Sequence, residues 1–206
     1  MNPVPLFLII VSLPLLLGGC GEKESVVKTK PVEEVPLNPN LKYEIKDGTV
    51  TITGCDKKAS GKLIIAATIE GKTVTSIGIQ AFDGCRSLTS ITIPDGVTSI
   101  GGRAFWQCTN LTSITIPDGV TSIGDFAFRG CSSLTSITIP DGVTSIGGKA
   151  FYDCTSLTAV TFLGDAPKDG RGVFFQATPT IYRNPEAKGW DETWGKRPVK
   201  LISERP

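Results

Sequence analysis

The 206-residue sequence contains no histidine, and its charges nearly balance, with 21 basic and 20 acidic residues. The absence of histidine excludes Ser-His-Asp and Cys-His catalytic arrangements and removes the side chain that most often transfers protons near neutral pH. The balanced charge leaves no strong field to attract nucleic acid or anionic lipid. We therefore predict a protein without enzymatic activity, cofactor or nucleic-acid partner.

The sequence also lacks a hydrophobic run long enough to span a bilayer comfortably. The apolar run from Val4 to Leu17 has the length of a signal-peptide core. It ends in Leu-Gly-Gly-Cys at Cys20, which matches the lipobox of bacterial lipoproteins. Residues 1–19 are therefore predicted to be a lipoprotein signal peptide, and Cys20 to be the lipidated residue. Because Lys and Arg are missing from the first five residues, an ordinary secretory signal with a chance cysteine is the alternative.

A lipid on Cys20 would anchor the chain to a membrane without a transmembrane helix. The predicted location is the bacterial cell envelope, at the outer membrane or cell surface. Residues 20–41 follow with mixed Lys and Glu, three prolines and no apolar period. This composition predicts an extended, disordered tether between the anchor and the folded part.

Four copies of Ala-Phe-x-x-Cys-x-x-Leu recur at intervals of 23 residues. A strict repeat of this length predicts a solenoid, in which each coil buries its apolar face only against its neighbours. Within a repeat, Ile alternates with Ser or Thr before a Pro-Asp-Gly turn, which predicts a short strand. The Ala-Phe-x-x-Cys segment predicts a helical or 3₁₀ turn. The repeated pairs are Phe82 and Cys85, Phe105 and Cys108, Phe128 and Cys131, and Phe151 and Cys154.

The consensus Leu-x-x-Ile-x-Ile-Pro-x-x-Val-x-x-Ile-Gly-x-x-Ala-Phe-x-x-Cys resembles the BspA-type bacterial leucine-rich repeat. The resemblance covers residues 74–163, predicted to form about four coils of short parallel strands. It implies a solenoid on the bacterial surface that takes part in adhesion and protein binding and has no enzymatic activity. Residues 42–73 are predicted to form an N-terminal β cap with a hairpin, and residues 164–206 an irregular C-terminal cap.

The repeated cysteines share one inward column and are spaced with Phe and Leu as small buried groups. We therefore predict buried free thiols. Bridges between neighbouring coils are the alternative, although in-register stacking rarely supplies the Cβ directions that a disulfide needs. One cysteine per coil, without histidine, offers no chelating pair, so no metal site is predicted.

Two repeat positions vary most between otherwise near-identical coils: the residue after the repeated Phe, and the residue two before it. Trp, Tyr and Arg are enriched in binding hot spots, and at coil spacing they would form one aromatic and cationic patch. Ordinary drift at exposed positions is the alternative. The candidate ligand contacts are Trp106, Arg129, Tyr152, Arg103, Phe126 and Lys149.

A secondary candidate is the flat hydroxyl-rich face formed by outward strand residues. Ordered hydroxyls could match a repeating ligand such as a polysaccharide, but Ser and Thr also simply suit exposed strands. This face comprises Ser90, Thr92, Ser113, Thr115, Ser136 and Thr138, and Ala159 and Thr161 are predicted to continue it. The aromatic and aliphatic residues near the C-terminus are predicted to plug the last coil, with sugar binding by the aromatic residues as the alternative: Phe174, Phe175, Ile181, Tyr182, Trp190, Trp194 and Leu201.

These observations predict a membrane-anchored binding protein that recognises a protein or a cell-surface glycan by non-covalent contacts. The alternative is a structural envelope component, in which exposed coils contact identical coils and the protein self-associates. A self-associating envelope component should assemble as its concentration rises, without any partner. A binding protein should stay monomeric until its ligand is added.

Overall fold

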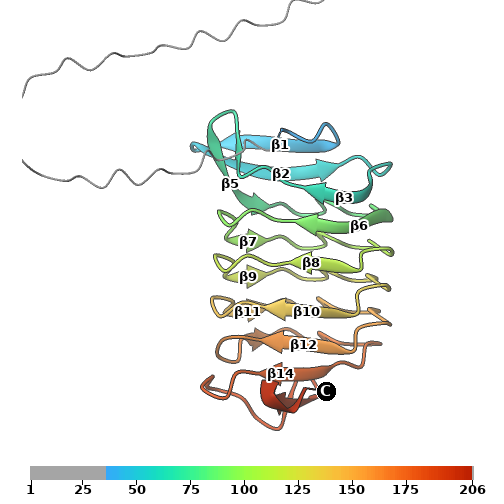
Figure 1. The fold of residues 1–206 in the computed structure, drawn as a ribbon, viewed down its shortest axis with the longest axis vertical. Coiled ribbons are helices and arrows are strands. Elements are labelled where there is room, and N and C mark those ends of the chain that lie inside the picture. The colour runs from blue at the N-terminus through green and yellow to red at the C-terminus, as the bar shows by residue number, and fades with distance from the viewer. Residues whose placement is uncertain (1–35, 206) are drawn as a thin grey trace, which may run out of the picture. The chain divides into compact units, whose positions relative to one another are not determined.

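The computed structural model describes residues 36–205, so the predicted signal peptide, Cys20 and most of the predicted tether lie outside it. The described residues form a solenoid of about six coils with short parallel strands (Figure 1). The predicted solenoid of short parallel strands is therefore confirmed, with more coils than the four expected. Within these residues, no helix has the length and apolar character needed to cross a membrane.

One side of the solenoid carries strands that pair in parallel as two successive sheets, with the break between residues 115 and 136. Ile114 of one strand pairs with Ile91 of the preceding one, and Thr115 with Thr92, so each position recurs as a column. The strands are β3 (Ser60–Ile64), β6 (Ser87–Thr92), β8 (Ser113–Thr115), β10 (Ser136–Ile139), β12 (Ala159–Phe162), β14 (Thr180–Arg183) and β16 (Arg197–Leu201).

A second side is built from another set of strands that also pair in parallel, most of them only two residues long. Ser99 lies opposite Ser76 and Ser122, and the Ser76 and Ser99 hydroxyl oxygens are 2.8 Å apart. These strands are β2 (Thr49–Cys55), β5 (Lys72–Ile77), β7 (Ser99–Ile100), β9 (Ser122–Ile123), β11 (Ser145–Ile146) and β13 (Lys168–Asp169).

The ends of the solenoid are closed by antiparallel strands. At the N-terminal end β1 (Leu41–Lys46) pairs with β2 around Asp47 and Gly48, whose φ angles are 50° and 75°. This is the turn geometry that suits a two-residue hairpin. The remaining elements are β4 (Thr68–Ile69), β15 (Thr193–Trp194), which pairs with β16, and a 3₁₀ helix at Ile202–Glu204.

The prediction of about four coils was too low because the terminal coils keep the strand pairing but lose the motif. Leu63 of β3 pairs with Ile91, although no Ala-Phe-x-x-Cys motif accompanies β3. Ile181 of β14 pairs with Val160 in the same way. Burial of one inward apolar residue per strand therefore suffices to continue the stack beyond the recognisable repeats.

The Ala-Phe-x-x-Cys segments form successive hydrogen-bonded turns and do not continue into a helix. The Trp106 amide donates to the Arg103 carbonyl at 3.1 Å, and the Cys108 amide to the Phe105 carbonyl at 3.3 Å. The backbone also bonds between coils, where the Phe105 amide donates to the Ala127 carbonyl at 2.7 Å. Each corner is thereby fixed to the next coil.

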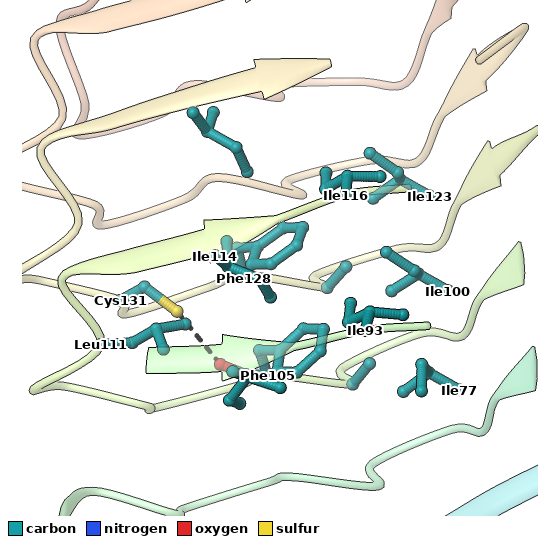
Figure 2. Packing of buried hydrophobic residues seen from close by; sticks show 14 of the residues in the cluster. Ile77, Ile93, Ile100, Phe105, Leu111, Ile114, Ile116, Ile123, Phe128 and Cys131 are labelled. Carbon is teal, nitrogen blue, oxygen red and sulfur yellow. Dashed lines mark hydrogen bonds between the residues drawn. The ribbon is translucent and has the colours of Figure 1, made fainter. Parts of the chain in front are cut away.

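The core is a set of stacked columns, of which the phenylalanine column is the largest. Phe105 and Phe128 stack with ring centroids 5.1 Å apart at 10°, and both are fully buried (Figure 2). The repeated cysteines are buried beside them as free thiols, as predicted. The buried thiols are Cys85, Cys108, Cys131 and Cys154, whereas Cys55 is half-buried.

Glycine at the corner before each aromatic turn allows this close stacking. A Cβ on Gly124 would lie 2.5 Å from the Gly102 backbone nitrogen, and one on Gly101 would lie 2.7 Å from the Gly78 carbonyl carbon. These contacts are with backbone, which cannot swing away as a side chain could. The glycines therefore set the spacing of the coils.

Two predictions about exposure were wrong. Ala159 and Thr161, expected to continue the hydroxyl face, are buried at 8% and 7% exposure, and Arg205 in the C-terminal tail donates toward the Thr161 hydroxyl at 3.5 Å. Phe175, expected to plug the last coil, is 55% exposed. The other large aromatics support the cap: Trp194 is buried and its Nε1 donates to the Pro167 carbonyl at 3.0 Å.

Candidate functional site

The six candidate ligand contacts lie together along one corner of the solenoid. Each of the three coils at this corner contributes one residue from either side of its buried Phe. Arg103 and Lys149 are exposed, and the other four side chains are half-buried. We call the six residues Arg103, Trp106, Phe126, Arg129, Lys149 and Tyr152 the ladder.

Within each coil of the ladder, a cation lies over an aromatic ring. The Arg103 Cζ is 4.4 Å from the centre of the Trp106 ring, and the Lys149 Nζ is 5.9 Å from the Tyr152 ring. In the coil between them the order is reversed, because the aromatic Phe126 precedes the cationic Arg129. Cations and aromatic rings therefore alternate in both directions across the ladder.

The alternation also joins neighbouring coils. The Arg129 Cζ lies 4.9 Å from the Trp106 ring centre and 4.6 Å from the Tyr152 ring centre. Cation–π contacts of this kind are worth about 0.5–1 kcal/mol at exposed sites and more when desolvated. Each cation is thus neighboured by rings and does not stack directly on another cation.

Arg129 is the central cation of the ladder, and part of its hydrogen-bonding capacity is unused. Its Nε is buried and has no hydrogen-bond partner among the described residues. A guanidinium has five N–H donors and no acceptor, so contacts with rings leave donors available. The geometry holds the side chain in place through ring contacts without saturating its hydrogen-bonding groups.

Stacking also determines which part of each ring faces solvent. Trp106 and Phe126 stack with ring centroids 6.2 Å apart at 20°, along the direction in which the coils repeat. The ring faces are therefore directed to neighbouring ladder residues and the ring edges outward. Ring edges carry positive electrostatic potential, as do the cations between them.

The backbone at Phe126 adopts a conformation that a bulky residue rarely takes. Its φ is 58°, and the equivalent residues Arg103 and Lys149 have φ of 57° and 55°. In the following coil glycine, Gly172, occupies this position with φ of 67°. A left-handed conformation costs a non-glycine residue about 1–2 kcal/mol, so the ring at Phe126 is kept where glycine would be favoured locally.

Phe175 continues the column of Trp106, Arg129 and Tyr152 by one coil, although it was predicted to plug the last coil. Its ring stacks on Tyr152 with centroids 5.4 Å apart at 6°. Phe174 occupies the position of the repeated buried Phe, so Phe175 falls on the same column as Trp106. Phe174 follows Phe151 by one repeat period, so the sequence could have placed Phe175 on this column.

The secondary candidate face lies on β6, β8 and β10. Its threonines Thr92, Thr115 and Thr138 are exposed, as expected for outward positions on a strand. A shallow cavity of about 350 Å³ is lined there by Ser113, Ser136 and neighbouring residues. The hydroxyl residues of the face are uncharged, although Asp118 also lines the cavity, and the role of the face as a ligand site remains a prediction.

Cys131 and Cys154, farther along the cysteine column, lie in an environment unsuited to thiolate chemistry. Burial raises the pKa of the Cys154 thiol to about 12, and burial also raises the pKa of Cys131 well above its ordinary value. A protonated, enclosed thiol is a poor nucleophile and a poor metal ligand. Within residues 36–205, no three or more acidic or cysteine side chains are grouped as a metal site would require.

Comparisons with known proteins agree with the repeat architecture. Residues 61–179 match the BspA type Leucine rich repeat region in six copies. A T. pallidum leucine-rich-repeat protein is 30% identical, with a TM-score of 0.65 over 73% of this chain and 71% of that one. One from Bacteroides capillosus ATCC 29799 is 33% identical, with a TM-score of 0.55 over 63% of this chain and 99% of that one.

A third solved structure, a leucine-rich repeat protein from Bacteroides ovatus ATCC 8483, is 31% identical with a TM-score of 0.50, over 71% of this chain and 46% of that one. Comparison with curated proteins found no match. The repeat spacing, the stacked parallel strands and the match over more than half of the sequence lead to one conclusion: this chain belongs to the BspA-type leucine-rich repeat family.

Proposed function

We propose that this protein is a non-enzymatic binding protein of the bacterial cell envelope that recognises a macromolecule through the ladder. Its family membership supports a role in binding or recognition. We choose the ladder as the binding surface because its cations and rings alternate, with Arg129 lying between Trp106 and Tyr152. Side chains held rigidly before binding lose little conformational entropy when a ligand arrives.

The backbone at Phe126 supports a functional reason for the ladder. Glycine at this position would remove the cost of the left-handed conformation, as Gly172 does one coil later. Strained residues cluster at binding sites, where the strain is tolerated because the side chain is needed. The ring of Phe126 contacts cations on both neighbouring coils, which is the arrangement that the ladder requires.

Anchoring through Cys20 is the second part of the proposal. Its support is the lipobox-like sequence after an apolar segment of signal-peptide length. Incorporation of labelled fatty acid into the protein, with release from membranes in Cys20→Ser, would support anchoring. A Cys20→Ser variant that remains membrane-bound and lacks any change in labelling would contradict it.

The binding role is tested by exposing the full chain to arrays of glycans and of surface proteins, beside two triple variants. Trp106→Ala, Arg129→Ala, Tyr152→Ala removes the ladder, whereas Thr92→Ala, Thr115→Ala, Thr138→Ala removes hydroxyls from the secondary face. Both variants should retain the wild-type far-ultraviolet spectrum, because none of the six residues belongs to the buried core. Loss of capture in the first variant alone supports the ladder.

Two other outcomes would change the assignment. Loss of capture in the threonine variant alone would move the site to the β6–β10 face. Absence of capture, together with concentration-dependent oligomers in light scattering, would favour the alternative of a self-associating envelope component.

A further inference from the structure

A cavity adjoins the C-terminal end of the ladder. It has a volume of about 770 Å³, within the range of small-ligand sites. Lys149 and Phe175 line it, so the cavity is continuous with the ladder, and Arg171 and Lys196 line it from later in the chain. Gly172 and Gly195 also line it, and a Cβ on Gly172 would lie 3.8 Å from the Lys149 side chain that lines the same cavity.

The charge of the cavity favours an anionic ligand. Three cationic side chains, Lys149, Arg171 and Lys196, face one carboxylate, Asp169. The outward-facing ring edges of the ladder add to the positive potential on the approach. Guanidinium and ammonium groups together provide several donors for carboxylate or sulfate oxygens.

Phe175 gives the same cavity one flat apolar surface. One face of its ring is stacked on Tyr152, and the side chain is 55% exposed and lines the cavity. In the ladder, by contrast, Trp106 and Tyr152 are covered by cations and rings. Phe175 is therefore the place along this corner where a sugar ring can stack on an aromatic face.

The far wall of the cavity is held rigidly. Gly195 and Lys196 form the turn between β15 and β16, with φ angles of 56° and 63° that match a two-residue hairpin turn. The next residue, Arg197, donates from Nη2 to the Phe174 carbonyl at 3.0 Å. Lys196 is thus presented from a fixed hairpin, which lowers the entropy lost on binding.

The backbone at this corner argues against an extended peptide as the ligand. The Lys149 amide donates to the Arg171 carbonyl at 3.1 Å, and the Asp153 amide donates to the Phe175 carbonyl at 3.0 Å. Within the ladder these donors are used between coils, so the ladder itself offers no free backbone edge for a peptide to extend. Cationic groups beside one free ring face fit an acidic sugar better.

We propose that the ladder and this cavity bind an acidic polysaccharide, with one acidic sugar in the cavity. Its ring stacks on Phe175, its carboxylate or sulfate meets Lys149, Arg171 and Lys196, and neighbouring sugars pass along the ladder. The inference rests on the proposed binding function and specifies its ligand class. Carboxylate and sulfate are two sources of the same anionic chemistry and are distinguished by experiment.

The test is calorimetric titration of the full chain with oligogalacturonate, with a sulfated dextran oligosaccharide, and with neutral dextran and oligoglutamate of matched length. Acidic oligosaccharides should bind, more weakly at higher salt, and the neutral one should not. Whichever acidic sugar binds more tightly identifies the anion. Phe175→Ala and Lys196→Gln should each lose about tenfold in affinity, as expected when one charge-assisted or stacking contact is removed.

Lys46→Gln, on β1 at the opposite end of the solenoid, is the matched control and should bind as wild type. Failure of both acidic oligosaccharides to bind would overturn the inference, as would oligoglutamate binding equally well and independently of Phe175. The binding function itself is judged separately: if array capture still depends on Trp106, Arg129 and Tyr152, the function stands and only the ligand class is wrong.

Discussion

The thiol of Cys131 donates a hydrogen bond to the backbone carbonyl oxygen of Phe105 in the preceding coil, with 3.2 Å between sulfur and oxygen (Figure 2). The same carbonyl accepts the Cys108 amide within its own coil at 3.3 Å. The cysteine therefore fills a core position and links two coils at once. The contact recurs at 3.1 Å for Cys108 with Phe82 and for Cys154 with Phe128.

Cys131→Ala should lower the free energy of unfolding by about 1–3 kcal/mol, because it removes the sulfur from a fully buried position and the second donor from the Phe105 carbonyl. Urea unfolding followed by circular dichroism measures the change. Cys55→Ala is the matched control, since Cys55 is half-buried and lies outside the column. Equal effects of the two substitutions would show that the hydrogen bond between coils adds nothing.

The buried thiols predict a loss of stability at high pH. Burial raises the pKa of Cys154 from 9.0 to about 12, so the folded chain keeps this proton when the unfolded chain releases it. The folded state then binds more protons than the unfolded state, and stability falls as pH rises. The contribution is fully present below pH 9 and is lost progressively toward pH 12.

Urea unfolding across this pH range should therefore show a steeper decline for wild type than for Cys154→Ala. The variant removes the titrating thiol and leaves the other ionising groups unchanged, so the difference between the two profiles isolates Cys154. Parallel profiles would mean that the thiol ionises as readily in the folded chain as in the unfolded one.

Gly124→Ala should destabilise the solenoid by about 2 kcal/mol or more, because the added Cβ would lie 2.5 Å from the Gly102 nitrogen and force two coils apart. Thermal unfolding provides the measurement. Gly54→Ala is the comparison, since its Cβ would meet only the flexible Lys42 side chain, at 3.4 Å. If the two alanines cost the same, close coil stacking does not depend on this glycine.

Phe126→Asn separates the binding role of the ladder from a structural one. Asparagine tolerates the left-handed conformation better than phenylalanine, so the backbone gain of about 1 kcal/mol should offset the lost ring contacts. The unfolding free energy should stay close to the wild-type value while ligand capture falls. A large loss of stability would instead identify the ring as a structural element.

The repeat could be predicted from the sequence because core and turn residues recur strictly. The buried columns that contain Phe105 and Cys108 follow from the repeat length alone. The terminal coils were missed because their strands pair without the motif, as Leu63 does. Burial of Thr161 was missed as well, since the local alternation of residues carries no information about the distant Arg205, which donates toward its hydroxyl.

The ladder could be located from the sequence, but its geometry could not. Variation at the positions of Trp106 and Phe126 marked two columns, whereas the alternation of cations and rings depends on contacts across coils. The left-handed backbone at Phe126 gives no sequence signal, because glycine is absent where it would be expected. Phe175 was placed in the cap because the repeat was judged to end before it.

The most direct test of the central claim is the affinity of the Arg129→Met variant for whichever macromolecule the wild-type chain captures. Methionine keeps an unbranched chain between the rings and removes the charge and the N–H donors. Arg86→Met, at an exposed position outside the ladder, is the control. The account predicts at least about a tenfold loss for Arg129→Met alone; wild-type affinity in a folded Arg129→Met protein would contradict it.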